Sequence, residues 1–336
     1  MHLVQLRKGN ARRVAMVREP ELVLLCEIHS VVELAQRALA EKRALTAMAD
    51  ELLSGDALHY DDVWEGRSEW KLLAPIDVPG DPQRVLVSGT GLTHLGSARE
   101  RQEMHIRPTA EEEKQMTDSM RMFEWGRQGG RPAAGSIGIA PEWFYKGDGS
   151  VIRGPLDALE IPGHAEDGGE EAEVAAIYLI ADDGTPWRLG MTPGNEFSDH
   201  VFERRNYLNL AGSKLRTCSI GPELVVSPDF SDVAGSVRIL RGEVVLWSKE
   251  IHTGEKNMCH SLANLEHHHF KFEGHRQPGT VHIHFMGADC LSYGEGVRLQ
   301  AGDVTEVQFH GFGRALRNPT AREAPLTAPI CVSQMQ

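Results

Sequence analysis

Two closely spaced glutamates, Glu171 and Glu173, stand at the head of an apolar run over residues 174–181. In a β-strand, residues i and i+2 project from the same face, so the two carboxylates would lie side by side. Such like charges repel each other unless a hard cation such as Mg²⁺, which prefers carboxylate oxygens, binds between them. The pair indicates a divalent-metal site or, as the simpler interpretation of the pair alone, a solvated edge of an acidic protein.

A third acid and a lysine follow the pair in the chain. Glu196 lies in the segment 194–199 (GNEFSD), and Lys214 lies in the segment 212–216 (GSKLR). A lysine beside a metal centre can neutralise an oxyanion or move a proton. Glu196 and Lys214 are therefore candidate residues, and it is the family resemblance given below that implies one site shared with Glu171 and Glu173.

The histidines form two groups that could be mistaken for metal ligands. His267, His268 and His269 are consecutive on an expected helix, so they cannot share one face, and we expect a polar helix end. His282 and His284 alternate on an expected strand and do share a face. They could be paired metal ligands, but no third ligand is evident beside them. Histidines that simply form hydrogen bonds within a sheet are more common, and we prefer that interpretation.

Composition excludes several classes of function. The formal charge of −13 argues against a nucleic-acid partner, which requires a basic face. The five cysteines form no CxxC pair and no disulfide framework. The first residues lack the apolar core of a signal peptide, and the apolar runs are too short to span a bilayer. We therefore expect a cytoplasmic protein with no membrane partner.

The elements that must position the candidate residues are mostly short strands. Thirty-four glycines and seventeen prolines suit a β-rich fold with many turns. Apolar spacing predicts a helix over 31–53, another near 257–270, and an amphipathic helix or lid over 97–128. The predicted strands are 2–7, 13–17, 84–88, 172–180, 223–226, 236–240, 244–248, 280–286 and 304–309. We expect a small N-terminal domain over 1–75 and a catalytic domain over 76–336.

Taken in order, these motifs resemble the fumarylacetoacetate hydrolase superfamily. That family has an E-x-E strand, an N-D-x-S loop with a third metal ligand, a lysine in a G-K-S-like turn, and a C/S-x-x-G-P segment. The matching segments here, with outlying ones of the same family, are 143–146, 154–155, 160–162, 171–173, 194–199, 212–216, 218–222, 287–289, 299–304 and 311–313. The resemblance covers roughly residues 72–319.

The resemblance implies a fold, a cofactor and a set of site residues. The fold would be α+β and β-rich, with a C-terminal mixed β-roll beside a small N-terminal α+β domain, usually as a homodimer. Glu171, Glu173 and Glu196 would hold Mg²⁺, for which Ca²⁺ or Mn²⁺ could substitute. Lys214 would act on a small 2-oxo acid substrate, which Gly287 and Ala288 would also contact.

Two departures from the family pattern bear on the reaction. The third ligand is Glu196 where aspartate is usual. The hydrolytic members carry an H-x-x-E pair on a lid, and here His94 is followed by Ser97 where the glutamate would be. This weakens the case for C–C bond hydrolysis, because that acid orients the histidine that activates water. His94, Ser97 and Arg99 remain candidates for the site.

The loop at Glu196 and the run Ser97–Arg99 resemble the branch of the family that dehydrates 2-keto-3-deoxy sugar acids. We therefore predict a magnesium-dependent dehydratase that converts a 2-keto-3-deoxypentonate, of the arabonate or xylonate type, to 2,5-dioxopentanoate. An acylpyruvate-type hydrolase that cleaves a C–C bond is the alternative. A binding protein without catalysis is a third interpretation, which the retained carboxylates and Lys214 disfavour. Residues 89–129 are expected to cover the site.

Overall fold

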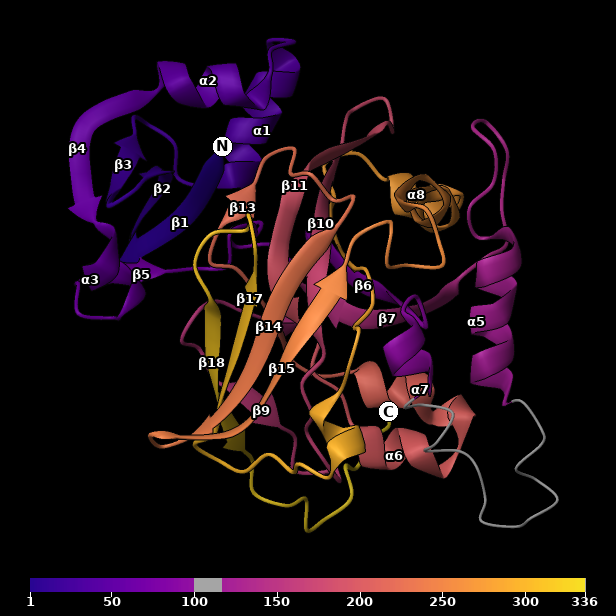
Figure 1. Ribbon diagram of the computed structural model, residues 1–336. Coiled ribbons are helices and arrows are strands. Elements are labelled where there is room, and N and C mark those ends of the chain that lie inside the picture. The colour runs from indigo at the N-terminus through magenta and orange to yellow at the C-terminus, as the bar shows by residue number, and fades with distance from the viewer. Residues whose placement is uncertain (100–116, 336) are drawn as a thin grey trace, which may run out of the picture.

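A large mixed sheet forms the centre of the protein (Figure 1). The computed structural model describes residues 1–99 and 117–335. Ten strands follow each other in the order β4-β3-β2-β1-β13-β11-β10-β16-β6-β7, and β5, β8 and β12 pair beside this path. Their bounds are β1 (His2–Lys8), β2 (Ala11–Arg18), β3 (Glu21–Leu25), β4 (Leu53–His59), β5 (Lys71–Leu72), β6 (Val85–Gly91), β7 (Glu142–Asp148), β8 (Ile152–Arg153), β10 (Ala172–Ile180), β11 (Pro186–Asn195), β12 (Cys218–Ile220), β13 (Leu224–Val225) and β16 (Val281–Phe285).

A second sheet and several short helices complete the fold. The second sheet has the order β15-β14-β17-β18-β9, with bounds β9 (Leu159–Ile161), β14 (Val233–Arg241), β15 (Val244–Thr253), β17 (Val304–Phe309) and β18 (Leu316–Arg322). The helices are α1 (Val31–Ala40), α2 (Leu45–Glu51), α3 (Tyr60–Trp64), α5 (Asp118–Gly129), α6 (His200–Arg205), α7 (Leu210–Lys214) and α8 (Leu262–Phe270). Within the described residues, no helix combines the length and apolar character needed to cross a membrane.

Strand β10 runs through the middle of the large sheet between β11 and β16, and it pairs antiparallel with both. All nine of its residues are buried, which explains its continuous apolar sequence. Side chains alternate between two hydrophobic cores: Ile177 and Leu179 belong to one, and Ala176 and Tyr178 to the other. Pairing on both sides and packing on both faces therefore fix the position of β10, at whose start Glu171 and Glu173 lie.

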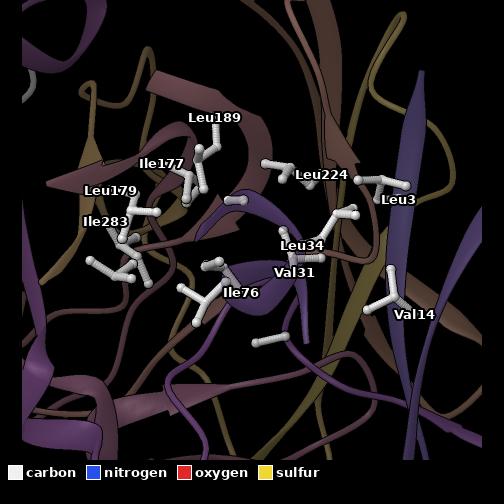
Figure 2. Packing of buried hydrophobic residues seen from close by; sticks show 14 of the residues in the cluster. Leu3, Val14, Val31, Leu34, Ile76, Ile177, Leu179, Leu189, Leu224 and Ile283 are labelled. Carbon is white, nitrogen blue, oxygen red and sulfur yellow. The ribbon is translucent and has the colours of Figure 1, made fainter. Parts of the chain in front are cut away.

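The N-terminal segment shares a core with the rest of the chain. Figure 2 shows Leu3 and Val14 of the first strands packed in one cluster with Val31 and Leu34 of α1, and with Ile177 of β10. Strand β1 also pairs with β13, which pairs with β11, so the sheet continues across the expected domain boundary. The division of the chain after residue 75 stays a prediction.

The predicted helix over 31–53 is wrong in its length, because the chain turns within it. Helix α1 ends at Ala40, and Lys42 adopts a left-handed conformation with φ of 52°. The amide of Arg43 then donates to the carbonyl of Ala38 at 2.9 Å, and that of Lys42 to Leu39 at 3.1 Å. These two bonds close a Schellman motif, which ends a helix without the usual glycine. Apolar periodicity continues into α2 and therefore conceals the turn.

Most other predicted elements are present with shifted ends. The predicted hairpin at residues 2–17 is confirmed as β1 and β2, and the strands over 172–180 and 304–309 keep their predicted bounds as β10 and β17. Helix α8 begins at Leu262 rather than near 257, because the side chain of Ser261 caps it by accepting from the amide of Asn264. Of the predicted helix or lid, α5 is described, and residues 100–116 lie outside the described residues.

The histidines of α8 and β16 meet in one buried network. The indole N–H of Trp143 donates to Nδ1 of His269 at 3.2 Å, so the proton of His269 is on Nε2, which lies 2.9 Å from Nδ1 of His282. His284 contacts the hydroxyls of Ser88 and Thr90 at 2.8 and 2.7 Å. The expected polar helix end is therefore wrong for His269, which is buried, whereas the strand histidines have ordinary hydrogen-bond partners.

This network makes stability depend on pH. Burial, with smaller effects of nearby histidines, lowers the pKa of His282 and of His284 to about 3, whereas histidine in an unfolded chain has a pKa of about 6.5. The unfolded chain therefore binds more protons below pH 6.5, and the free energy of unfolding should decrease as the pH falls towards 3. At pH 5 the loss should be on the order of 2 kcal/mol per histidine, measured by urea denaturation at pH 7.5 and pH 5.

A double variant isolates this effect. His282→Asn with His284→Asn should lose less stability between pH 7.5 and pH 5 than the wild type does. His267→Asn, which changes an exposed histidine of α8, should retain the wild-type dependence of stability on pH. Buried Glu170 and Glu173 have raised pKa values, chiefly through burial, and act in the opposite direction in every variant. Equal losses in the wild type and the double variant would contradict the assignment.

Candidate metal centre and active site

The three candidate glutamates converge where β10 and β11 meet. Glu173 belongs to β10, Glu171 directly precedes that strand, and Glu196 directly follows β11. The backbone amide of Glu196 donates to the carbonyl of Glu171 at 2.9 Å, and the amide of Glu171 donates to the side chain of Asn195 at 3.1 Å. One oxygen of each carboxylate lies within 4.8 Å of the other two, and all three residues are buried.

This spacing fits a divalent cation. Ligand oxygens lie about 2.0–2.6 Å from Mg²⁺ or Ca²⁺, so two ligands of one ion are separated by at most about 5 Å. Oε1 of Glu196 is buried and lies 2.6 Å from the ammonium of Lys146. A set of three carboxylates is the donor chemistry of a hard cation, which fits Mg²⁺, Ca²⁺ or Mn²⁺. The solvated acidic edge is therefore excluded as an interpretation of the pair.

Two buried lysines partly neutralise the carboxylates. Lys214, at the end of α7, donates from Nζ to Glu171 at 2.6 Å and to Glu196 at 2.5 Å. Its ammonium also lies 4.7 Å from the ring centre of Phe144. Lys146 of β7 donates to the carbonyl of Phe197 at 2.7 Å while it contacts Glu196. Lys214 thus hydrogen-bonds to two of the three carboxylates, and its predicted role on substrate stays a prediction.

The electrostatics of the cluster favour a bound cation. Burial, followed by the charges of Glu171 and Glu196, raises the pKa of Glu173 well above its ordinary value. Without a cation, the three carboxylates therefore resist being ionised together. Burial lowers the pKa of Lys146, against the opposing charge of Glu196. A divalent ion would supply the positive charge that the two lysines do not fully provide.

Hydrogen bonds fix the remaining carboxylate oxygens. The hydroxyl of Ser198 donates to Oε2 of Glu196 at 2.8 Å, and the backbone amide of Gly287 donates to Oε2 of Glu173 at 2.6 Å. Gly287 has a φ of 99°, and a Cβ there would lie 1.9 Å from the hydroxyl of Thr93. The position therefore requires glycine. Gly287, with buried Ala288 next to it, lies beside the site as predicted, but its binding of substrate stays a prediction.

His94 is buried next to this region in a fixed tautomer. The hydroxyl of Thr93 donates to the carbonyl of Met286, so it accepts the proton of Nδ1 of His94 at 2.8 Å. Nε2 of His94 then accepts from the hydroxyl of Thr253 at 3.0 Å. Burial lowers the pKa of His94 to about 4, against the smaller opposing effect of Asp289. The imidazole is therefore neutral at pH 7, and both of its nitrogens are bound.

The other two candidates from this region are placed differently. Ser97 lies in the helical segment 95–99, and its hydroxyl donates to the backbone carbonyl of His94 at 3.3 Å. Arg99 is exposed at the end of the same segment. The structure thus brings the three glutamates together, with Lys214 bonded to Glu171 and Glu196, and Gly287 bonded to Glu173. The roles of His94, Ser97 and Arg99 stay predictions.

Two residues of the site were not predicted from the sequence. Lys146 is fully buried. It lies on the buried face of β7, whereas its neighbour Tyr145 is exposed on the other face, and this alternation along the strand is the sequence pattern that could have indicated it. A lysine on the buried face of a strand requires a charged partner. His200 lies with Nε2 3.1 Å from Oε1 of Glu171. Nothing in its sequence position indicates that contact, because it depends on how α6 follows the loop.

The fold is shared with solved enzymes of one architectural class. A scan of protein-family models and a search of curated proteins both find no match. The structure is similar over 96% of this chain and all of the other to 5-carboxymethyl-2-hydroxymuconate delta-isomerase from Mycobacterium smegmatis, at 17% identity and a TM-score of 0.57. The fold predicted from the resemblance to the fumarylacetoacetate hydrolase superfamily is confirmed: the structure is rich in strands and also contains helices, as in these enzymes.

The structure is also similar to that of a sugar-acid dehydratase, solved in more than one form. 2-Keto-3-deoxyarabinonate dehydratase in a hexagonal crystal form is 18% identical, with a TM-score of 0.71 over 96% of this chain and 99% of the other. The same dehydratase complexed with magnesium and 2,5-dioxopentanoate gives a TM-score of 0.70 over 96% of this chain and the whole of the other. At this level of identity the likeness establishes the fold.

Proposed function

We propose that this chain is a divalent-metal-dependent dehydratase of a 2-keto-3-deoxy sugar acid. The preferred substrate is a 2-keto-3-deoxypentonate, of the arabonate or xylonate type, and the product is 2,5-dioxopentanoate. The observation that carries the proposal is the buried group of Glu171, Glu173 and Glu196, with Lys214 bound to two of the three. The fold shared with a dehydratase that was solved with magnesium and 2,5-dioxopentanoate supports it.

The carboxylates and Lys214 have distinct tasks in this reaction. Glu171, Glu173 and Glu196 would hold Mg²⁺, which when bound polarises the 2-oxo group of the substrate as a Lewis acid. Lys214 lies between two of these ligands, where its ammonium can stabilise negative charge on the 2-oxo oxygen or move the proton from C3. The enzyme removes that proton and the C4 hydroxyl as water. The C3=C4 double bond that this leaves moves to C4=C5 as C5 loses a proton and C3 gains one, and the resulting enol tautomerises to the C5 aldehyde, so no external oxidant is needed.

The C4 hydroxyl leaves as water only if a general acid with a transferable proton lies beside it. Neutral His94 carries its only ring proton on Nδ1, which donates to Thr93, and its Nε2 accepts from Thr253, so it could act as the donor only after the contact with Thr93 opens. The described partners of His94 are hydroxyl groups, and Ser97 stands where hydrolytic relatives carry a glutamate. This arrangement favours dehydration over hydrolysis, which needs a histidine oriented by a carboxylate to activate water.

A substrate assay tests the proposal directly. Purified protein with Mg²⁺ is incubated with 2-keto-3-deoxyarabonate and, separately, with 2-keto-3-deoxyxylonate, and products are identified by mass spectrometry. We expect 2,5-dioxopentanoate from at least one of the two epimers, and none after the metal is removed with EDTA. Formation of pyruvate instead, or cleavage of an acylpyruvate with no dehydration of either sugar acid, would replace this proposal by the C–C bond hydrolase.

We also propose that the chain assembles as a homodimer. Val244, Val245 and Leu246 are exposed at the start of β15, which is an edge strand of the second sheet. Exposed apolar residues on an edge strand are a surface that a second chain can cover. Light scattering of the purified protein measures the mass of the assembly.

A further inference from the structure

We propose that His200 is a positioning residue that sets the orientation of Glu171 for metal binding. This inference rests on the metal centre of the proposed function, but it does not depend on the identity of the substrate. His200 is the first residue of α6 and is 2% exposed. Its Nε2 lies 3.1 Å from Oε1 of Glu171. Because a carboxylate only accepts hydrogen bonds when ionised, Nε2 carries the proton and donates it.

The backbone that carries His200 is itself held by a buried ion pair. Asp199 caps α6 by accepting from the amide of Phe202 at 2.9 Å. Its other oxygen accepts from Arg216 at 3.1 Å and from the amide of Glu166 at 3.0 Å. Asp199 and Arg216 are both buried. These hydrogen bonds hold the backbone at the start of α6 in one position. The side chain of His200, which directly follows Asp199, is therefore attached to a fixed backbone.

The other side of the ring is packed without a polar partner. Nδ1 of His200 is buried and has no hydrogen bond with any of the described residues, and a Cβ at Gly169 would lie 2.3 Å from it. The centre of the Tyr293 ring lies 5.1 Å from that of His200, and the guanidinium carbon of Arg298 lies 3.9 Å from the centre of the same tyrosine ring. By contrast, both ring nitrogens of His94 are bonded.

An unbonded buried nitrogen points to a role for the nitrogen that is bonded. Burying a polar atom without a partner is unfavourable, so an apolar side chain of similar size would suit this pocket better if packing were its only task. The polar contact that the ring makes is the one to Glu171. Groups that hydrogen-bond to a metal ligand orient it, and their loss typically weakens metal binding about 10- to 100-fold.

Variants at this position separate an orienting role from a packing role. Glutamine can place an N–H near the position of Nε2, asparagine can place one near Nδ1, and leucine removes both. We expect His200→Leu and His200→Asn to weaken Mn²⁺ binding about 10- to 100-fold in titration calorimetry, and His200→Gln to restore most of the affinity. His260→Leu removes an equally buried histidine that contacts Asn264 instead, and it should bind Mn²⁺ as the wild type does.

The outcomes distinguish this inference from the proposed function. Equal Mn²⁺ affinity in the glutamine and asparagine variants would overturn the inference, even if the leucine variant fails to fold. The inference is also overturned if His200→Leu folds and binds Mn²⁺ as tightly as the wild type. A wild-type protein that binds Mn²⁺ but dehydrates neither sugar acid would refute the proposed function, and a loss of affinity in His200→Asn with rescue in His200→Gln would still support the role of His200.

Discussion

Glu173→Gln should lower the affinity for Mg²⁺ at least about 100-fold and reduce turnover to background, because even the loss of an indirect contact to a metal ligand has an effect of this size. The same change should stabilise the metal-free protein. Burial and the neighbouring charges raise the pKa of Glu173, so a neutral amide there relieves repulsion with Glu171 and Glu196. Titration calorimetry and thermal unfolding with and without EDTA measure the two opposite effects.

The control for this variant is a glutamate away from the cluster. Glu250→Gln changes an exposed carboxylate of β15 and should alter neither Mg²⁺ affinity nor the melting temperature of the metal-free protein. If Glu173→Gln bound Mg²⁺ with wild-type affinity, the three carboxylates would not be the metal centre. If the metal-free variant were instead less stable than the wild type, the hydrogen bond from the amide of Gly287 to a charged Glu173 would contribute more to stability than the repulsion among the carboxylates costs.

Lys214→Met should reduce turnover by a factor of about 1,000 or more and leave the affinity for Mg²⁺ undiminished. Loss of one group that stabilises an oxyanion or transfers a proton typically reduces the rate about 100- to 10,000-fold. Affinity should not fall, because the ammonium of Lys214 binds Glu171 and Glu196 and so competes with the ion for their charge. Single-turnover kinetics and titration calorimetry measure the two quantities on one preparation.

Stability gives a second readout for this lysine. Without Lys214, the buried carboxylates lose a cationic partner, so the metal-free variant should unfold at a lower temperature than the wild type. Saturating Mg²⁺ should recover much of this loss, because a ligand that binds the folded state stabilises it. Lys256→Met, which changes an exposed lysine, serves as the matched control. Normal turnover in Lys214→Met would leave the proposed mechanism without its central cation.

The sequence predicts the core of the site because its signals are local. Glu171 and Glu173 are two residues apart on a strand, and Glu196 follows the next strand, so a single hairpin of β10 and β11 brings all three together. The helix over 31–53 is longer than the real one because a left-handed residue, Lys42, ends it where glycine would be the expected signal. Periodicity of apolar residues does not report such a turn.

Contacts between distant elements could not be predicted. Lys146 reaches Glu196 because β7 and the loop after β11 meet in space, and the burial of a lysine is visible only in the fold. His269 is consecutive with exposed His267, yet it is buried because it faces β16. The proposed lid depends on residues 100–116, which lie outside the described residues, so that prediction remains open.

The pairing of β1 with β13 has a consequence for how the chain is made. His2 lies opposite Val225, so one edge of the first strand must wait for a partner more than two hundred positions later in synthesis. The local pairing of β1 with β2 can form at once, and Leu6 and Arg7 can pair with β5 soon afterwards, but His2 and Leu3 have no partner on their other side until β13 has been made. Contacts so distant in sequence form slowly. The beginning of β1 therefore stays open to pairing with other chains until residues 224–225 have been made.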